Sequence, residues 1–289
     1  MFKGSFVALA TPFRNGLIDE DALRALLDFH LANGTHGIVP CGTTGEAATM
    51  SHEEHKRVLS LVVSHVNHRI PVICGAGSNS TSEAIELALH AKKIGGDGAL
   101  VVTPYYNKPP QEGLYRHYEA IASKADIPIV IYNVPSRTGI CIQPETVARL
   151  SRLSNIVAIK EASGSLDQVS AILKMCDITV LSGEDTLTVP MMTLGAKGVI
   201  SVTANVVPDL MAQMVDAALA GDFKKAEKIH YQLFDLTKAL FCETNPIPVK
   251  YALKLMGKLT GDLRLPLCEM SESNSKKLKT VLEQLSVLK

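Results

Sequence analysis

The chain has 289 residues, of which 46% are hydrophobic and 20% charged, so a large buried core is expected and extensive disorder is not. Lysine plus arginine equals aspartate plus glutamate at 29 each. A zero net charge argues against nucleic acid or an anionic membrane as a partner, because both require a basic surface. No apolar run is long enough to span a bilayer, and the first residues lack the layout of a signal peptide.

The six cysteines lie far apart, without a Cys-x-x-Cys pair. This spacing indicates free thiols in a reducing cytoplasm rather than a disulfide framework or a zinc site. His52 and His55 are three positions apart, whereas the histidines of the HExxH zinc motif are four apart, so an ordinary pair on a helix surface is preferred. We therefore expect a cytoplasmic protein without a bound metal.

Short runs rich in β-branched residues alternate with longer helix-like segments. Eight strands are predicted in chain order, at residues 5–10, 37–41, 72–75, 99–103, 129–132, 156–161, 179–182 and 198–202. Between the first two strands, residues 21–32 carry leucines at helical spacing. Strict alternation of strand and helix predicts a parallel sheet with right-handed crossovers. Eight such units favour closure into an α/β fold of the (β/α)8 TIM-barrel type.

Beyond Val207 the pattern is purely helical, with helices predicted near residues 209–218, 223–240, 246–256 and 274–288. We expect a catalytic barrel over residues 1–220 and a C-terminal helical extension over residues 221–289. A Gly-x-x-Gly spacing recurs between a helix and the next strand, at residues 34–37, 95–98 and 195–198. The first glycine suits a left-handed helix C-cap, and the second suits a tight entry into the strand.

Lys160 lies near the end of a predicted strand, directly before a polar turn. Strand alternation places four residues on one face of that strand: Ile156, Ala158, Lys160 and Ala162. If this face points into a barrel, the apolar surroundings disfavour a charged ammonium and leave a nucleophilic amine. The alternative is a lysine that extends to water at a strand end or pairs with a carboxylate.

Further polar residues follow the strands, at the mouth where barrel enzymes place their sites. The phenol of Tyr132 suits proton transfer at a reacting imine, although a core tyrosine with a bonded hydroxyl is an alternative. The Gly42–Glu46 stretch joins a strand to a helix, and its hydroxyls and free amides either hold a small carboxylate or cap the helix. Arg137, in the loop after Tyr132, either binds a second carboxylate or is solvated.

Signatures of phosphate and nucleotide binding are missing. The Gly42–Glu46 stretch lacks the Gly-Lys-Ser/Thr of a P-loop, and residues 75–80 lack the third glycine of a dinucleotide fingerprint. The acidic pair Glu184-Asp185 follows the seventh strand, where many barrels bind phosphate. We therefore expect no cofactor.

Together these stretches resemble the dihydrodipicolinate synthase family, within the pyruvate-dependent N-acetylneuraminate lyase superfamily. The matching stretches run in order over most of the chain: Gly42-Thr-Thr-Gly-Glu46, Tyr132-Asn-Val-Pro-Ser-Arg-Thr-Gly139, Ile159-Lys-Glu-Ala162, Ser182-Gly183, Gly198-Val-Ile-Ser-Val-Thr-Ala-Asn205 and Asn245-Pro-Ile-Pro-Val-Lys250. Each is weak alone, and their co-occurrence makes the resemblance specific.

The resemblance implies a lyase of the class I aldolase type in the diaminopimelate route to lysine. Lys160 would form a Schiff base with pyruvate, whose methyl carbon would then attack aspartate semialdehyde. The implied proton relay consists of Tyr132, Thr43 and Tyr106, the last supplied by a neighbouring subunit of a homotetramer built from two tight dimers. The implied substrate-binding residues are Thr44 for the pyruvate carboxylate, Arg137 for the semialdehyde carboxylate, and the carbonyls of Gly183 and Ile200.

A regulatory site is also implied. Lysine-inhibited members of the family bind L-lysine at the tight-dimer interface, with residues that match His52, His55, Asn79, Glu83 and Tyr105. Ala47 departs from some inhibited relatives, which carry serine there, so the effect is expected to be weaker. A solvated polar face is the alternative.

Two other functions stay open at this point. The first is a related pyruvate aldolase, either an N-acetylneuraminate lyase or a 2-keto-3-deoxy sugar-acid aldolase. Arg137 argues against it, because a polyol chain prefers neutral hydrogen-bonding groups to a cation. The second is a non-catalytic barrel that senses a metabolite, which would not need an amine nucleophile.

Overall fold

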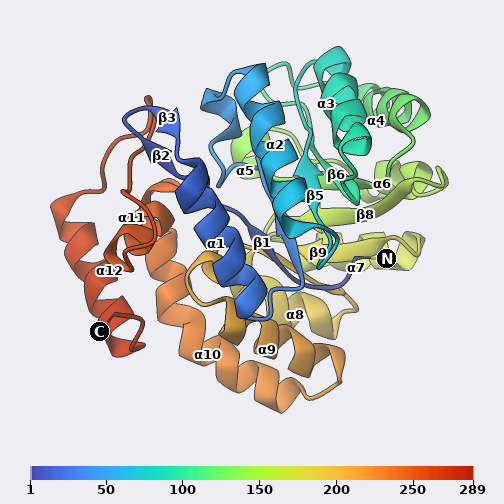
Figure 1. Ribbon diagram of the computed structural model, residues 1–289. Helices are drawn as coiled ribbons and strands as arrows, with labels where there is room; N and C mark the ends of the chain where they lie inside the picture. Colours follow the sequence, from blue (N-terminus) through green and yellow to red (C-terminus); the bar gives the residue numbers. More distant parts are fainter. Residues whose placement is uncertain (1, 289) are drawn as a thin grey trace.

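The computed structural model describes residues 2–288 and contains eight parallel strands arranged as a barrel inside a layer of helices (Figure 1). The strands are β1 (Gly4–Ala8), β4 (Gly37–Val39), β5 (Ile73–Gly75), β6 (Gly98–Val102), β7 (Ile129–Asn133), β8 (Ile156–Glu161), β9 (Thr179–Ser182) and β10 (Gly198–Ser201). Their order is β4-β1-β10-β9-β8-β7-β6-β5. A parallel bridge between Ile38 and Val72 brings the two ends of the sheet together. The predicted TIM barrel is therefore confirmed.

Eight helices cover the barrel, namely α1 (Glu20–Ala32), α2 (His52–Val66), α3 (Thr81–Lys93), α4 (Gln111–Ala125), α6 (Pro144–Leu150), α7 (Leu166–Met175), α8 (Thr188–Thr193) and α9 (Pro208–Leu219). Capping fixes where several of them begin. At α2, the Ser51 hydroxyl accepts from the Glu54 N–H, and the Glu54 carboxylate accepts from the Ser51 N–H. Among residues 2–288, no helix has the length and hydrophobicity needed to cross a bilayer.

Shorter elements lie at the ends of the strands. They are the helix α5 (Pro135–Thr138) and the 3₁₀ helices η1 (Ala47–Thr49), η2 (Asp185–Leu187) and η3 (Thr203–Asn205). A small antiparallel hairpin of β2 (Phe13–Arg14) and β3 (Leu17–Ile18) follows β1. The sequence does not predict this hairpin, because two-residue strands are too short to show a period.

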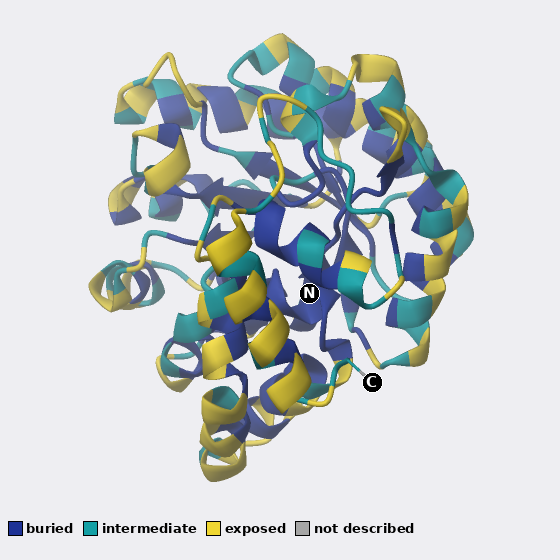
Figure 2. Cartoon of the chain, turned by 90° about the vertical axis from the view of Figure 1, so that its left-hand side faces the viewer, coloured by how far each residue is buried: buried dark blue, intermediate teal, exposed yellow. Residues whose placement is uncertain are grey.

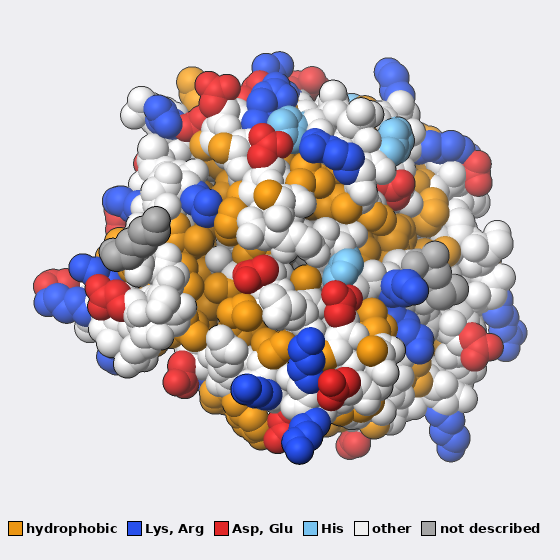
Figure 3. All heavy atoms as spheres, turned by 60° about the horizontal axis from the view of Figure 1, so that its bottom comes forward, with side chains coloured by type: hydrophobic (Ala, Val, Ile, Leu, Met, Phe, Trp, Pro, Cys, Tyr) orange, Lys and Arg blue, Asp and Glu red, His pale blue; other side chains and the backbone are white. Residues whose placement is uncertain are grey.

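Three helices follow the barrel: α10 (Phe223–Leu240), α11 (Ile247–Leu255) and α12 (Glu272–Gln284). In Figure 1 they lie together at the side of the barrel next to α1 and α9, with α10 packed along α9. The predicted helices agree with α9 to α12 in position, although α12 ends four residues before the predicted end at residue 288. On the face shown in Figure 3, acidic and basic side chains are interspersed rather than separated into large patches.

The core has two layers. Figure 2 shows buried residues at the centre and exposed residues mainly on the outer faces of the helices. A large apolar layer lies between the strands and the helices. A smaller cluster fills the barrel, formed by Phe6, Ala8, Val39, Ile73, Leu100, Val130, Tyr132, Val134, Ala158, Ala162, Leu181 and Ile200. The interior is therefore packed and not a pore.

The repeated glycines have the predicted geometry. Gly34, Gly95 and Gly195 have φ values of 73°, 83° and 119°, in the left-handed region that favours glycine after a helix. A Cβ on Gly37 would lie 2.1 Å from the Phe6 ring, and one on Gly198 would lie 2.0 Å from the carbonyl oxygen of Gly4. The second glycine of each of these two pairs thus lets the chain enter the barrel against its neighbouring strand.

One expectation about β8 is wrong. The predicted inner face included Ile156, but this residue belongs to the outer apolar layer, and Val157 packs against the inner cluster instead. The cause is an irregular register between β7 and β8, where Ile129 pairs with Ile156 but Val130 pairs with Ala158. From Ala158 onward the alternation holds, so Lys160 is directed into the barrel.

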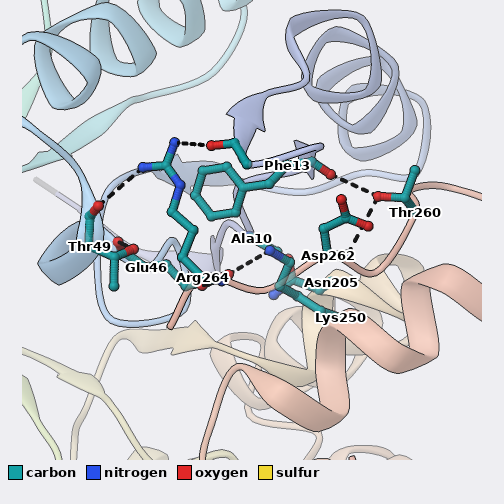
Figure 4. Close-up of polar contacts among 10 residues, drawn as sticks. Ala10, Phe13, Glu46, Thr49, Asn205, Lys250, Thr260, Asp262 and Arg264 are labelled. Atoms are coloured by element: carbon teal, nitrogen blue, oxygen red, sulfur yellow. Dashed lines mark hydrogen bonds and ion pairs between the residues drawn. The ribbon is translucent and has the colours of Figure 1, made fainter. Parts of the chain in front are cut away.

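A buried ion pair attaches the C-terminal extension to the barrel (Figure 4). Lys250, at the start of α11, donates to Glu46 at 2.5 Å, and both side chains are almost fully buried. Burial lowers the pKa of Lys250, and the Glu46 carboxylate opposes that shift. The Glu46 carboxylate also accepts from the Arg264 N–H, and the Lys250 amine lies 4.4 Å from the centre of the Phe13 ring.

Replacing Lys250 with methionine is expected to lower the free energy of unfolding by about 3–5 kcal/mol, because Glu46 would be left as a buried charge without its cation. Urea unfolding followed by circular dichroism measures this change. Lys276→Met, which removes an exposed pair with Glu272 on α12, is the control and should leave the stability nearly unchanged. Equal stability of the two variants would contradict this account.

Candidate active site

Lys160 and Tyr132 lie together inside the barrel mouth. They pair directly in the register of β7 and β8, and they are 6% and 7% exposed. The Lys160 amine lies 4.2 Å from the centre of the Tyr132 ring, over its face. Adjacent parallel strands therefore bring the amine and the aromatic side chain into contact.

The walls around Lys160 are apolar and closely packed. Leu181 of β9 pairs with Lys160 in register, and Ile200 of β10 is 1% exposed. A Cβ on Gly183 would lie 2.7 Å from the Ala162 Cβ and 3.1 Å from the Lys160 Cε. Glycine at position 183 thus leaves room for the lysine side chain, which gives this predicted site residue a steric role.

A cavity of ≈ 470 Å³ opens beside this pair. It is lined by several predicted site residues, including Thr43, Tyr132 and Arg137. Lys160, Gly183 and Ile200 are not among its lining residues, so the amine borders the cavity only through the Tyr132 ring. The volume suits a small metabolite.

The Gly42–Glu46 loop differs from its predicted form. It continues into the three-residue 3₁₀ helix η1 and not into an α-helix, while Glu46 has a φ of 54°. The start of α2 is capped separately by Ser51. A helix N-terminus therefore does not supply the expected carboxylate site. The loop offers two hydroxyl groups instead. Thr43 lines the cavity, and Thr44 is 2% exposed.

Asn245, from the C-terminal extension, joins the two predicted carboxylate sites. Its Nδ2 donates to the Thr44 Oγ1 at 3.0 Å, and its carbonyl accepts from the Arg137 Nη2 at 3.2 Å. Its Oδ1 is buried and has no partner among the described residues. From the sequence, Asn245 is only part of a motif and has no predicted role, because no local pattern indicates contacts 201 and 108 residues away.

Tyr106 does not meet the other relay residues within this chain. Its side chain is 90% exposed, its φ is 70°, and it does not line the cavity. The structure of one chain thus brings Tyr132 and Thr43 to the cavity but leaves Tyr106 directed to the outside.

The same cavity is also lined by most residues of the predicted lysine site. Ala47, His52, His55, Glu83 and Tyr105 line it, whereas Asn79 does not. The Ser78 hydroxyl donates to the Glu83 carboxylate at 2.7 Å. The His55 Nε2 lies 2.7 Å from the Gly75 carbonyl oxygen, and burial lowers the pKa of this imidazole.

Two buried carboxylates support the mouth from behind. Glu161 accepts from the Asn133 side chain at 2.9 Å and from the Ser163 N–H at 2.7 Å, and burial raises its pKa. Asp185 accepts from the N–H groups of Val202 and Thr203, each at 3.0 Å, and burial raises its pKa too. Asp185 therefore ties the loop after β9 to the loop after β10.

Among residues 2–288, no three histidine, cysteine, aspartate or glutamate side chains are grouped to bind a metal ion.

Comparison with known proteins places these features in a family. The model of the dihydrodipicolinate synthetase family matches residues 1–285. The 4-hydroxy-tetrahydrodipicolinate synthase of Syntrophus aciditrophicus (strain SB) is 58% identical over 290 residues, covering 100% of both chains.

Solved structures agree with the sequence comparison. A chloride-inhibited dihydrodipicolinate synthase from Acinetobacter baumannii, complexed with pyruvate, matches with a TM-score of 0.98 and 44% identity over 100% of both chains. A family member from Cyanidioschyzon merolae with lysine bound matches with a TM-score of 0.96 and 41% identity over 99% of both chains. The chain therefore belongs to the dihydrodipicolinate synthetase family.

Proposed function

We propose that this chain is a 4-hydroxy-tetrahydrodipicolinate synthase, which condenses pyruvate with L-aspartate-4-semialdehyde. The observation that carries the proposal is the buried Lys160 amine over the Tyr132 ring, beside a cavity that Thr43 and Arg137 line. A relative 58% identical over its full length carries the name of this synthase, which favours it over the sialate lyase and the sugar-acid aldolases. The retained amine also argues against a non-catalytic sensor.

The chemistry follows from an amine in water-poor surroundings. The Lys160 Nζ attacks the ketone of pyruvate, and water leaves to give an imine. The imine withdraws electrons, so the methyl group loses a proton and the adduct becomes an enamine. This carbon forms a bond to the aldehyde carbon of the semialdehyde, whose oxygen takes a proton and becomes the hydroxyl group. The semialdehyde's own amine then displaces Lys160 and closes the six-membered ring.

Supporting residues have separate roles in this proposal. Tyr132, Thr43 and Tyr106 transfer the protons. Thr44 holds the pyruvate carboxylate, and the carbonyls of Gly183 and Ile200 border the reacting atoms. Arg137 holds the semialdehyde carboxylate, and its bond to the Asn245 carbonyl at 3.2 Å helps to orient the guanidinium.

A second subunit completes the site in this proposal. Tyr106 is a large aromatic residue with 90% of its surface exposed, and Tyr105 beside it is 40% exposed. An exposed aromatic pair of this kind suits an interface. We place Tyr106 in the site of the neighbouring subunit, within a cytoplasmic homotetramer of two tight dimers.

Borohydride reduction tests the covalent step. With pyruvate, it should add a reduced three-carbon group to the Lys160 peptide, measured by mass spectrometry, because only an imine is trapped in this way. Lys160→Ala should lose both the adduct and turnover. The exposed Lys197→Ala is the control and should keep both. An unmodified Lys160 peptide in the unaltered protein would reject the mechanism.

Arg137→Ala tests the second carboxylate site by steady-state kinetics. The KM for aspartate semialdehyde should rise about 10-fold to 100-fold, the size expected for losing a charge-assisted hydrogen bond. The KM for pyruvate should change less than about threefold. Arg152→Ala, at an exposed position, should change neither value. Equal effects on the two substrates would remove the role assigned to Arg137.

Substitution of Glu83 tests the proposed L-lysine site, where the Glu83 carboxylate would pair with an amine of the inhibitor. Glu83→Gln should raise the lysine concentration for half-inhibition by about tenfold or more, because a charged hydrogen bond is lost. Glu86→Gln, which removes an exposed carboxylate from the same helix, is the matched control. Unchanged lysine inhibition of the Glu83 variant would rule out this site.

A further inference from the structure

The loop after β7 has to place Arg137 at a set distance from Lys160. In the proposed function, the guanidinium holds the carboxylate of the semialdehyde while the enamine on Lys160 attacks the aldehyde of the same molecule. A small shift of either residue therefore changes the alignment of the two reacting carbons. This requirement rests on the proposed function, and it makes the attachment of the loop to β8 part of substrate recognition.

Lys160 and Arg137 are held in different ways. Lys160 belongs to β8, and it pairs in register with Tyr132 on one side and with Leu181 on the other. Arg137 lies in the short helix α5, outside the sheet. Among residues 2–288, its guanidinium makes one hydrogen bond, to the Asn245 carbonyl at 3.2 Å. The position of Arg137 therefore depends on how the backbone of its loop is fixed.

Asn133 joins the two ends of this loop. It is the last residue of β7, and its Oδ1 accepts from the Ile142 N–H at 3.2 Å, between residues nine positions apart in the chain. The Ile142 carbonyl in turn accepts from Gln168 of α7 at 2.8 Å. Arg137 thus lies in a loop whose beginning and end are fastened to each other through one side chain.

The other end of the same amide reaches β8. Asn133 pairs in register with Glu161, directly after the pair of Tyr132 and Lys160, and both Asn133 and Glu161 are fully buried. The Asn133 Nδ2 donates to the two carboxylate oxygens of Glu161 at 2.9 and 3.2 Å. The Glu161 carboxylate also accepts from the Ser163 N–H at 2.7 Å. The loop is thereby fastened to the residue that follows the nucleophile.

An amide meets both demands at this position. The Ile142 N–H requires an acceptor and the Glu161 carboxylate requires a donor, and asparagine offers one at each end of its side chain. Aspartate would offer acceptors alone and would set two buried carboxylates against each other. An apolar residue would leave both groups without a partner.

We propose that Asn133 is a positioning residue that sets the spacing between Arg137 and Lys160. It acts through the Arg137 loop and does not touch the substrate. Because the strand ladder holds Lys160 on both sides, the formation of the imine with pyruvate does not depend on Asn133. The use of aspartate semialdehyde does depend on it, since that substrate must bind Arg137 and meet the enamine at once.

Exchanging the amide and the carboxylate tests this contact. Asn133→Asp sets two carboxylates face to face, and we expect kcat/KM for aspartate semialdehyde to fall about 10-fold to 100-fold. Adding Glu161→Gln restores every bond, because the amide at position 161 donates to the carboxylate at position 133 and accepts from the Ser163 N–H. The double variant should lie within about threefold of the unaltered protein. The borohydride adduct with pyruvate should stay within about twofold in both variants.

A loss of stability alone would also be reversed by this exchange, so a second measurement combines Asn133→Asp with Arg137→Ala. Once the guanidinium is absent, Asn133→Asp should lower kcat/KM for the semialdehyde further by less than about threefold. Asn155→Asp is the matched control, because the Asn155 Nδ2 donates to the Ala122 carbonyl just before β8, at the opposite end of that strand. This variant should leave kcat/KM within about twofold.

Three results would overturn the inference. They are an unchanged kcat/KM for the semialdehyde in Asn133→Asp, an equal loss in the presence and absence of the Arg137 guanidinium, and a double variant no more active than Asn133→Asp. If circular dichroism shows that Asn133→Asp does not fold, Asn133→Ala takes its place in the combination with Arg137→Ala, and the same non-additivity is expected. The proposed function fails separately, when the unaltered protein forms no product from pyruvate and aspartate semialdehyde.

Discussion

The pairing of β7 with β8 is the constraint on which the site depends. Parallel register places Lys160 directly beside Tyr132, and Leu181, Ala158 and Ala162 form one buried apolar cluster with that tyrosine. A shift of one residue in this register would turn the lysine toward the helices and away from the mouth. The irregularity at Ile129 and Val130 lies upstream of the pair, so it changes the face of Ile156 without disturbing Lys160.

The C-terminal extension is part of the site and not only an appendage. Asn245 bonds to Thr44 and to Arg137, so one residue holds the two groups to which we assign the substrate carboxylates. The buried pair of Lys250 and Glu46 secures the same segment to the loop that carries Thr43 and Thr44. Arg264 reinforces this attachment by bonding to Glu54, whose pKa falls to about 2, mainly because of that hydrogen bond. Helices far along the chain thereby position a loop that follows the second barrel strand.

The buried carboxylates at the barrel mouth stabilise the loops that follow the strands. Asp185 and Glu161 accept hydrogen bonds from backbone N–H groups of these loops and hold the backbone in place. Tyr132, Glu83 and His52 line one cavity, so the proposed substrate site and the proposed lysine site share one hollow space. Such continuity offers a short route for coupling between them.

Several features follow from the amino-acid sequence alone: the eight strands, the order of strand and helix, the left-handed glycines and the inward direction of Lys160. Local rules suffice for these features, because alternation, helical period and turn chemistry act over a few residues. Other features become visible only in the folded chain. Ile156 faces outward, the loop after β4 ends in a 3₁₀ helix, and Asn245 and Lys250 reach Thr44 and Glu46. The contacts of Asn245 and Lys250 join segments about 200 residues apart, and the face of Ile156 depends on the register of β8 with β7. Neither leaves a periodic trace along the chain.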